Sequence, residues 1–258
     1  MLPSFLRHPG KSAVLTSMIV LLGACATHHS VKYLVISETY TEHGISGVPV
    51  LKNAQQGATL VFDALGRLST AGSVHPQPTR ELTPKSWKSA TDNLKNSLSS
   101  SKQDYAVVYI AAHGAVDSSG QIVLFDSTGH PFLANEALQH IRDEAAASVF
   151  FLDICRTENE ALVTATSGVD LRGKNTVLLF STDFNHAASD STAFAEQIAL
   201  EIPKRQELRI TLRNIIDGVI RDSSQTADPR HVHTPWPYGL IDSDIYLAGP
   251  PRKPGTPP

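Results

Sequence analysis

The chain has 258 residues, of which 41% are hydrophobic and 18% are charged, and this composition excludes an intrinsically disordered protein. The formal net charge is −3, and the Lys and Arg residues are dispersed along the sequence. We therefore expect no nucleic-acid partner, because nucleic-acid binding needs a concentrated basic surface. The length is sufficient for one large domain or two small ones.

The first 25 residues have the layout of an export signal. A basic start is followed by an apolar run at 13–24, which ends in Leu22-Gly23-Ala24 directly before Cys25. This layout resembles a bacterial lipoprotein signal, in which the cysteine is lipidated. The apolar run is shorter than the about 20 residues of a typical membrane span. An uncleaved anchor and an ordinary signal peptide are the alternatives.

The same segment predicts where the protein resides. We expect residues 1–24 to be removed, Cys25 to carry the lipid, and residues 25–31 to form a short tether to the membrane. The protein would then be anchored in the bacterial cell envelope and face the periplasm. Ala26 follows the cysteine, where an Asp would favour retention in the inner membrane, so we expect the outer membrane.

Strands and helices alternate along residues 32–248, which we expect to form one domain. Apolar runs predict strands at 32–37, 105–112, 121–125, 148–153 and 176–181. Apolar positions at three- and four-residue steps predict helices at 53–65, 84–98, 135–145, 191–201 and 208–222, the second of them capped by Thr83. We expect a loop at 70–83, the end of the ordered domain at 241–247, and a Pro-rich tail at 249–258 that does not pack.

This alternation predicts an α/β fold with a mostly parallel sheet and helices on both faces. Functional sites in such sheets form at the carboxyl ends of the strands. His113 follows the strand at 105–112, and Cys155 follows the strand at 148–153. The two side chains can therefore meet if these strands are neighbours.

Cys155 is the only cysteine left for chemistry if Cys25 is lipidated, because the chain has two cysteines. A nearby histidine such as His113 can take the thiol proton and so generate the nucleophilic thiolate. Gly114 lacks a side chain, so its backbone N–H can turn toward an oxyanion, and the N–H of Cys155 can be a second donor. The alternative is a structural histidine and an inert buried cysteine.

Two motifs resemble those of the caspase-like cysteine peptidases, especially the bacterial metacaspase-like (orthocaspase) branch. Residues 109–114 (YIAAHG) look like the family's Y-x-x-x-H-G, and residues 152–156 (LDICR) look like L-D-A-C-R. Weaker similarities follow in the same order, with 51–58 similar to L-x-N-A-x-x-D-A, 180–183 to Y-A-T-A and 235–247 to P-W-x-Y…D-F-Y-L.

The resemblance implies a fold and a set of roles. The fold would be a central, mostly parallel sheet with helices on both sides. His113 would be the base, Cys155 the nucleophile, and Gly114 with the Cys155 N–H the oxyanion hole. Metacaspase-like members cleave protein or peptide substrates after Arg or Lys, and the position of Asp153 lies in their primary specificity pocket. The alternative role of Asp153 is to cap the following turn. We expect no cofactor and no metal.

Two positions depart from the family pattern. Gly57 stands where the family has an Asp, which removes a second acidic group from the pocket, and Asn185 stands where many relatives have Gly. Asp183 is a candidate to restore the negative charge near the substrate. The departures motivate a rival hypothesis, a non-catalytic interaction module on the same scaffold. His231 and His233 form a His-x-His motif for which no third metal ligand is evident.

Overall fold

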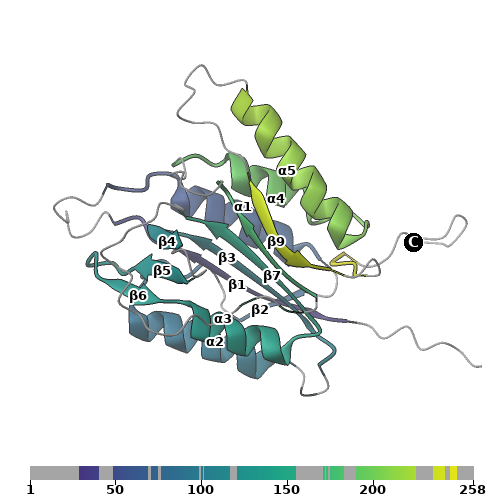
Figure 1. The fold of residues 1–258 in the computed structure, drawn as a ribbon, viewed down its shortest axis with the longest axis horizontal. Coiled ribbons are helices and arrows are strands. Elements are labelled where there is room, and N and C mark those ends of the chain that lie inside the picture. The colour runs from purple at the N-terminus through teal and green to yellow at the C-terminus, as the bar shows by residue number, and fades with distance from the viewer. Residues whose placement is uncertain are drawn as a thin grey trace, which may run out of the picture.

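The computed structural model describes residues 29–40, 49–68, 71–74, 77–98, 100, 102–116, 121–154, 171, 173, 175–182, 190–224, 235–241 and 245–248. In this part of the chain a central sheet is covered by helices on both faces (Figure 1). The predicted α/β fold with a mostly parallel sheet is therefore confirmed. The proposed signal segment 1–24, Cys25 and the tail 249–258 lie outside the described residues.

The central sheet has the strand order β2-β1-β3-β7-β8-β9. Its strands, in that order, are Ala71–Ser73, Val31–Ser37, Tyr105–Ala111, Ala147–Asp153, Thr176–Phe180 and Trp236–Leu240. All neighbours in this sheet are parallel except β8 and β9, which are antiparallel. A second, antiparallel sheet has the order β4-β5-β6 and consists of Gly114–Val116, Ile122–Phe125 and Pro131–Leu133.

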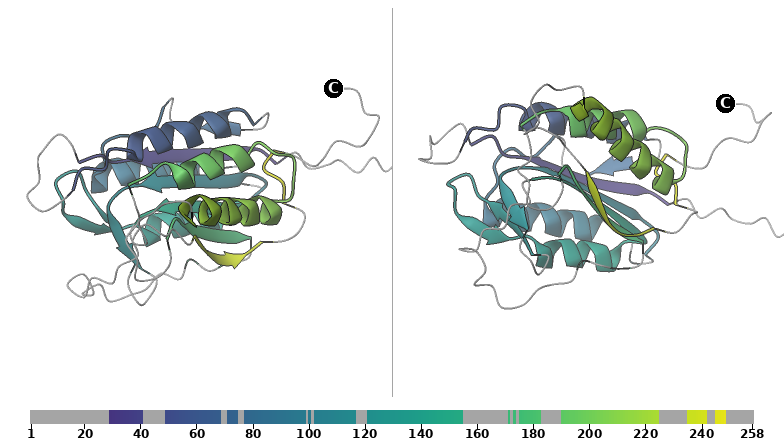
Figure 2. Two further views of the ribbon diagram at one scale, coloured as in Figure 1. Left: turned by 90° about the horizontal axis from the view of Figure 1, so that it is seen from above. Right: turned by 45° about the horizontal axis from the view of Figure 1, so that its top comes forward.

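The helices of the described residues lie in two layers. One face of the central sheet is covered by α1 (Ala54–Gly66), α4 (Ala193–Glu201) and α5 (Leu208–Ser224), and the other by α2 (Pro84–Ser97) and α3 (Asn135–Glu144), as Figures 1 and 2 show. Successive side chains of a strand point to opposite faces, so each layer has its own hydrophobic cluster. In β3, for example, Val107 and Tyr109 belong to one cluster, and Val108 and Ile110 belong to the other.

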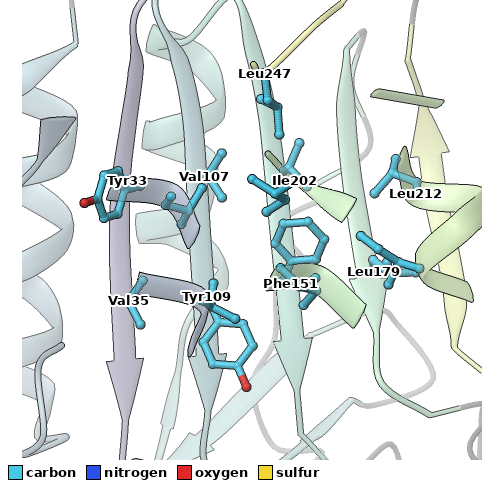
Figure 3. Packing of buried hydrophobic residues seen from close by; sticks show 14 of the residues in the cluster. Tyr33, Val35, Val107, Tyr109, Phe151, Leu179, Ile202, Leu212 and Leu247 are labelled. Atoms are coloured by element: carbon cyan, nitrogen blue, oxygen red, sulfur yellow. The ribbon is translucent and has the colours of Figure 1, made fainter. Parts of the chain in front are cut away.

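The first of these clusters fixes the strands that lead to the candidate site. Figure 3 shows Val107 and Tyr109 of β3 beside Phe151 of β7, in one layer of side chains. Phe151 contacts Phe194 of α4 edge to face, with the ring centroids 6.3 Å apart. Every residue of β3 is buried, so the strand is held along its whole length up to the residues that precede His113.

The predicted elements lie within two residues of the observed ones. Thr83 is confirmed as the cap of α2, since its side chain accepts from the Ser86 N–H and Ser86 Oγ accepts from the Thr83 N–H. Four short strands were missed: β2 lies in the predicted loop, β4 and β6 flank β5, and β9 precedes residues 241–247. They have three to five residues, too few for a hydrophobic period, and β9 contains Pro237 and Gly239, which are uncommon inside strands.

Candidate active site

The strands that precede His113 and Cys155 are neighbours. β3 and β7 pair in parallel over their full lengths, and the last pair in register is Ala111 with Asp153. In the sequence, His113 comes two residues after Ala111, and Cys155 comes two residues after Asp153. The expected adjacency of the two strands is therefore confirmed, with both motifs at the same carboxyl edge of the sheet.

Several predicted site residues lie outside the described part of the chain. Cys155 comes directly after Ile154, where the description stops before resuming at Leu171. Also outside it are Asp183, Asn185, His231 and His233. The predicted site residues that the structure describes at this edge are His113, Gly114 and Asp153.

Both main-chain groups of His113 are hydrogen-bonded. Its carbonyl accepts from the N–H of Phe125 in β5, at 3.0 Å. Its own N–H donates to the hydroxyl of Tyr40, at 3.1 Å, and this hydroxyl donates in turn to the Phe125 carbonyl, at 2.8 Å. The main chain at His113 is thus attached to β5 both directly and through Tyr40.

The imidazole of His113 is held by two further contacts. Its Nε2 lies 2.7 Å from the carbonyl oxygen of Pro49. Because a carbonyl only accepts, Nε2 carries the hydrogen, and Nδ1 of the neutral ring keeps its lone pair. The ring also packs against Tyr40, with centroids 4.7 Å apart and planes inclined by 43°. This tautomer gives the partly exposed ring a nitrogen that can accept a proton.

Gly114 begins β4, and the hydrogen-bond pattern fixes the direction of its N–H. Hydrogen-bonded and non-hydrogen-bonded pairs alternate in an antiparallel ladder. His113 and Phe125 are hydrogen-bonded, so the next pair, Gly114 with Leu124, is not. The Gly114 N–H is therefore directed away from β5, at the edge of the small sheet. A donor in this position can face a ligand at the end of β3.

Gly114 is also packed too closely for a side chain. A Cβ atom at this position would lie 2.8 Å from the carbonyl oxygen of Val123 and 3.3 Å from Cβ of Ile154. Ile154 is fully buried and is the residue before Cys155 in the sequence. The His-Gly motif therefore contacts the segment that leads directly to the cysteine. Glycine is therefore required at position 114 because neighbouring atoms approach the main chain too closely for a side chain. The sequence suggested a different reason, the freedom of the N–H to turn toward an oxyanion.

Asp153 ends β7 and is partly buried. The hydroxyl of Tyr109, which is fully buried in β3, donates to Asp153 Oδ2 at 3.2 Å. Burial raises the pKa of Asp153 from 3.8 to about 6, and the nearby hydroxyls of Ser181 and Tyr109 offset only part of this rise. The alternative role, capping of the turn after β7, concerns residues outside the described part.

A second acidic residue, Asp190, influences Asp153, and it was not identified from the sequence. Its negative charge contributes to the raised pKa of Asp153. The exposed Asp190 precedes α4, and its carboxylate accepts from the backbone N–H groups of Lys52, at 2.7 Å, and of Asn53, at 2.9 Å. These groups lie at the start of α1, where a helix favours a negative charge. Asp190 therefore joins two helices at the same edge of the sheet as Asp153.

Gly57, where the family pattern has an acidic residue, lies in the middle of a tight contact. A Cβ atom there would be 3.1 Å from Cβ of Ala195 in α4 and 3.1 Å from the hydroxyl of Tyr109. That hydroxyl is the donor to Asp153. At this position α1 therefore packs directly on the partner of the carboxylate, and an acidic side chain would require its neighbours to move.

Tyr40 and Pro49 were also missed by the sequence analysis. Both come from the segment between β1 and α1, and they act through a hydroxyl group and a backbone carbonyl group. A contact through a backbone carbonyl group cannot be predicted from residue types, because every residue has this group. A lone tyrosine outside any periodic element gives no signal either.

Among the described residues, no group of three or more His, Cys, Asp or Glu side chains is placed to bind a metal ion. Within the same ranges, no helix has both the length and the apolar character that crossing a bilayer requires.

The fold and the strand-end site define a class, the α/β domains with a mostly parallel, doubly covered sheet and a site at its carboxyl edge. The family model of the caspase domain matches residues 34–233, and the chain therefore belongs to the caspase family. This membership supports cysteine peptidase activity in general, and a peptidase domain implies protein or peptide substrates. A search of curated proteins found no match.

Proposed function

We propose that the protein is a caspase-like cysteine endopeptidase of the metacaspase-like type, with His113 as the base and Cys155 as the nucleophile. The observation that carries the proposal is the register of β3 and β7, which end together at Ala111 and Asp153. Two residues further along each chain segment come the histidine and the cysteine. The tautomer fixed by Pro49 supports the role of His113, since it leaves Nδ1 as the acceptor.

The reaction is an acyl transfer in two steps. Nδ1 of His113 takes the thiol proton, the thiolate attacks the carbonyl carbon of the scissile peptide bond, and the Gly114 N–H donates to the resulting oxyanion. Collapse of this intermediate breaks the C–N bond, and the imidazolium returns its proton to the leaving amine. Water, deprotonated by His113, then hydrolyses the thioester and restores the thiol.

Cleavage after Arg or Lys is the second part of the proposal. Asp153 supports it, because a partly buried carboxylate with its pKa raised to about 6 is an unstable anion that gains from a bound cation. Asp190 adds negative charge in the same region. Asp183, the candidate for the same contribution in the sequence, lies outside the described residues and stays a prediction.

The location is the third part of the proposal. The arrangement of the basic start, the apolar run 13–24 and Cys25 supports a lipid anchor on Cys25. The protein would be held at the bacterial cell envelope, facing the periplasm from the outer membrane, by more than one acyl chain. Mass spectrometry of the membrane fraction tests the anchor: an unmodified Cys25, or a retained segment 1–24, would contradict it.

The test of the activity compares four proteins on fluorogenic peptides with Arg, Lys, Asp or Ala before the scissile bond. These are the wild type, Cys155→Ala, His113→Ala and the control His140→Ala. The control changes a histidine of α3, which covers the same face of the central sheet as α2. We expect cleavage after Arg and Lys by the wild type and the control, and a loss of roughly three orders of magnitude or more in the two site variants. Activity that survives both site substitutions would contradict the dyad. No cleavage by the wild type, together with a Cys155 that resists alkylation, would favour the non-catalytic module.

A further inference from the structure

Tyr40 has a strained backbone that a buried carboxylate stabilises. Its φ angle is 59°, in the left-handed region that residues other than glycine seldom adopt. Glu38 Oε1 accepts from the N–H groups of Thr39, at 2.8 Å, and of Tyr40, at 3.0 Å, and Oε2 accepts from the N–H of Leu82, at 2.8 Å. Glu38 and Tyr40 are both almost fully buried. Strain that the surroundings hold in place in this way is typical of residues with a functional constraint.

The hydroxyl of Tyr40 replaces one hydrogen bond of the β4–β5 ladder. His113 and Phe125 extend the register of Gly114 with Leu124 by one pair, and a regular pair at this point exchanges two direct hydrogen bonds. One of them is present, from the Phe125 N–H to the His113 carbonyl, at 3.0 Å. In place of the other, the His113 N–H donates to the Tyr40 hydroxyl, at 3.1 Å, which donates to the Phe125 carbonyl, at 2.8 Å. The hydroxyl thus separates the two strands at His113.

The ring of the same tyrosine supports the imidazole. The ring centroids of Tyr40 and His113 are 4.7 Å apart. The Nε2 atom of the same imidazole is hydrogen-bonded to the Pro49 carbonyl oxygen, at 2.7 Å. The orientation of His113 therefore depends on one contact to its main chain, one to its ring face and one to its ring nitrogen, and Tyr40 provides the first two.

We propose that Tyr40 is a positioning residue for His113: its hydroxyl sets the place of the histidine main chain, and its ring sets the plane of the imidazole. The proposal rests on the proposed function, because it assigns a role to Tyr40 through the base of the dyad. Burial raises the pKa of Tyr40 far above its usual value, so the hydroxyl keeps the proton that it donates to Phe125.

Tyr40→Phe separates positioning from folding. It removes the hydroxyl and keeps the ring, and the vacated site lets the His113 N–H bond directly to the Phe125 carbonyl. No buried polar group is then left without a partner, so the stability should change little. The main chain of His113, however, moves toward β5, and Nδ1 moves with it.

The readout is the pH dependence of Cys155 alkylation by iodoacetamide, measured in the full chain by mass spectrometry of the peptide that contains Cys155. A thiol paired with histidine reacts at a pH well below the free-cysteine pKa of about 8.5. We expect the wild type to react faster at pH 6.5 than His113→Ala, and Tyr40→Phe to fall roughly three- to tenfold below the wild type. The control is Tyr33→Phe, since the buried Tyr33 packs on Phe62 of α1, with ring centroids 5.5 Å apart. Its profile should match the wild type.

The outcomes separate this proposal from the proposed function. If His113→Ala reacts like the wild type, there is no dyad, and both proposals are overturned. If His113→Ala slows the reaction but Tyr40→Phe does not, the dyad stands and the role of Tyr40 is wrong. An equal effect of Tyr33→Phe would show a general loosening and would also overturn the role. If Tyr40→Phe does not fold, Glu38→Gln gives the second test: it keeps Tyr40 but weakens the support of its backbone, and an unchanged profile would overturn the proposal.

Discussion

Tyr109 and Asp153 link the two strands that lead to the histidine and the cysteine, through a hydrogen bond of 3.2 Å from the Tyr109 hydroxyl to Asp153 Oδ2. Burial and the charge of Asp153 hold the pKa of Tyr109 well above its usual value, so Tyr109 stays a donor. This bond offsets only part of the cost of burying the carboxylate, since the pKa of Asp153 is still about 6. Strongly shifted pKa values cluster at functional sites, so the raised pKa of Asp153 supports a role for this carboxyl group in the candidate active site.

Asp153→Asn should stabilise the fold above pH 6. The pKa of Asp153 is raised from 3.8 to about 6, so between these values the folded chain holds a proton that the unfolded chain has released. The free energy of unfolding therefore falls as the pH rises through this window, and it stays lower above it. After allowance for solvent screening of a partly buried group, we expect a gain of about 1–2 kcal/mol at pH 8 and none at pH 3.5. Thermal unfolding at the two pH values measures it.

Asp126 offers a matched control of opposite sign. It is also buried, but hydrogen bonds from Thr128 and His130 outweigh the effect of burial and lower its pKa. Its carboxylate therefore stabilises the fold above the usual pKa of 3.8, and this contribution is lost as the pH falls. Asp126→Asn should destabilise the protein at pH 8. The same sign for both variants would contradict the different environments of the two carboxylates.

The same Asp153→Asn variant should lose preference for basic substrates. A charge-assisted pair between Asp153 and the Arg side chain is worth roughly 1.5–3 kcal/mol, so kcat/KM on Arg substrates should fall by roughly one to two orders of magnitude. On substrates with Ala at this position kcat/KM should change little. For the wild type, kcat/KM on Arg substrates should decline below about pH 6, where Asp153 becomes protonated. An equal loss on both substrates would mean that Asp153 supports the site without contacting the substrate side chain.

The larger part of the fold could be predicted from the sequence. Strands such as β3 and β7 are continuous apolar runs, and α2 combines a regular apolar face with Thr83 and Pro84 at its start. In these elements the periodicity, the capping residues and the burial agree, and this agreement makes a local pattern reliable. The positions of His113 and Asp153 at strand ends followed from the same patterns.

The contacts that orient the site could not be predicted. Tyr40 reaches His113 across 73 positions of the sequence, and Asp190 reaches Asn53 across 137. Such contacts depend on the three-dimensional course of the loops, which residue patterns do not show. The strands β4 and β6 have three residues each, too few for a hydrophobic period that would predict them. The sequence placed the missing acid at Gly57, but it did not show that the Tyr109 hydroxyl lies against that position.

Gly114→Ala should reduce both activity and stability. Its Cβ would lie 2.8 Å from the Val123 carbonyl oxygen, a backbone atom that moves only if the strand moves. We expect a loss of about 1–3 kcal/mol of stability and a fall in kcat of roughly tenfold or more, because the N–H that we propose as the oxyanion donor shifts with the strand. Gly72→Ala in β2 is the control, since its Cβ would meet only the Lys32 side chain, at 3.6 Å. It should be neutral in activity and in stability, and a comparable loss in both variants would contradict the steric argument.

Asp190→Asn should lower the pKa of Asp153, because it removes a negative charge that opposes ionisation of that carboxyl group. The acid limb of the pH profile of kcat/KM on Arg substrates should therefore move to lower pH, because the Asp153 carboxylate is no longer repelled by a second negative charge. The amide can accept only one of the two N–H bonds from Lys52 and Asn53, so the start of α1 should lose about 1 kcal/mol of stability. The control is Asp217→Asn in α5. Asp217 is not among the groups that shift the pKa of Asp153, so this variant should leave the acid limb in place. An acid limb that stays in place in Asp190→Asn would show that its charge does not reach the pocket.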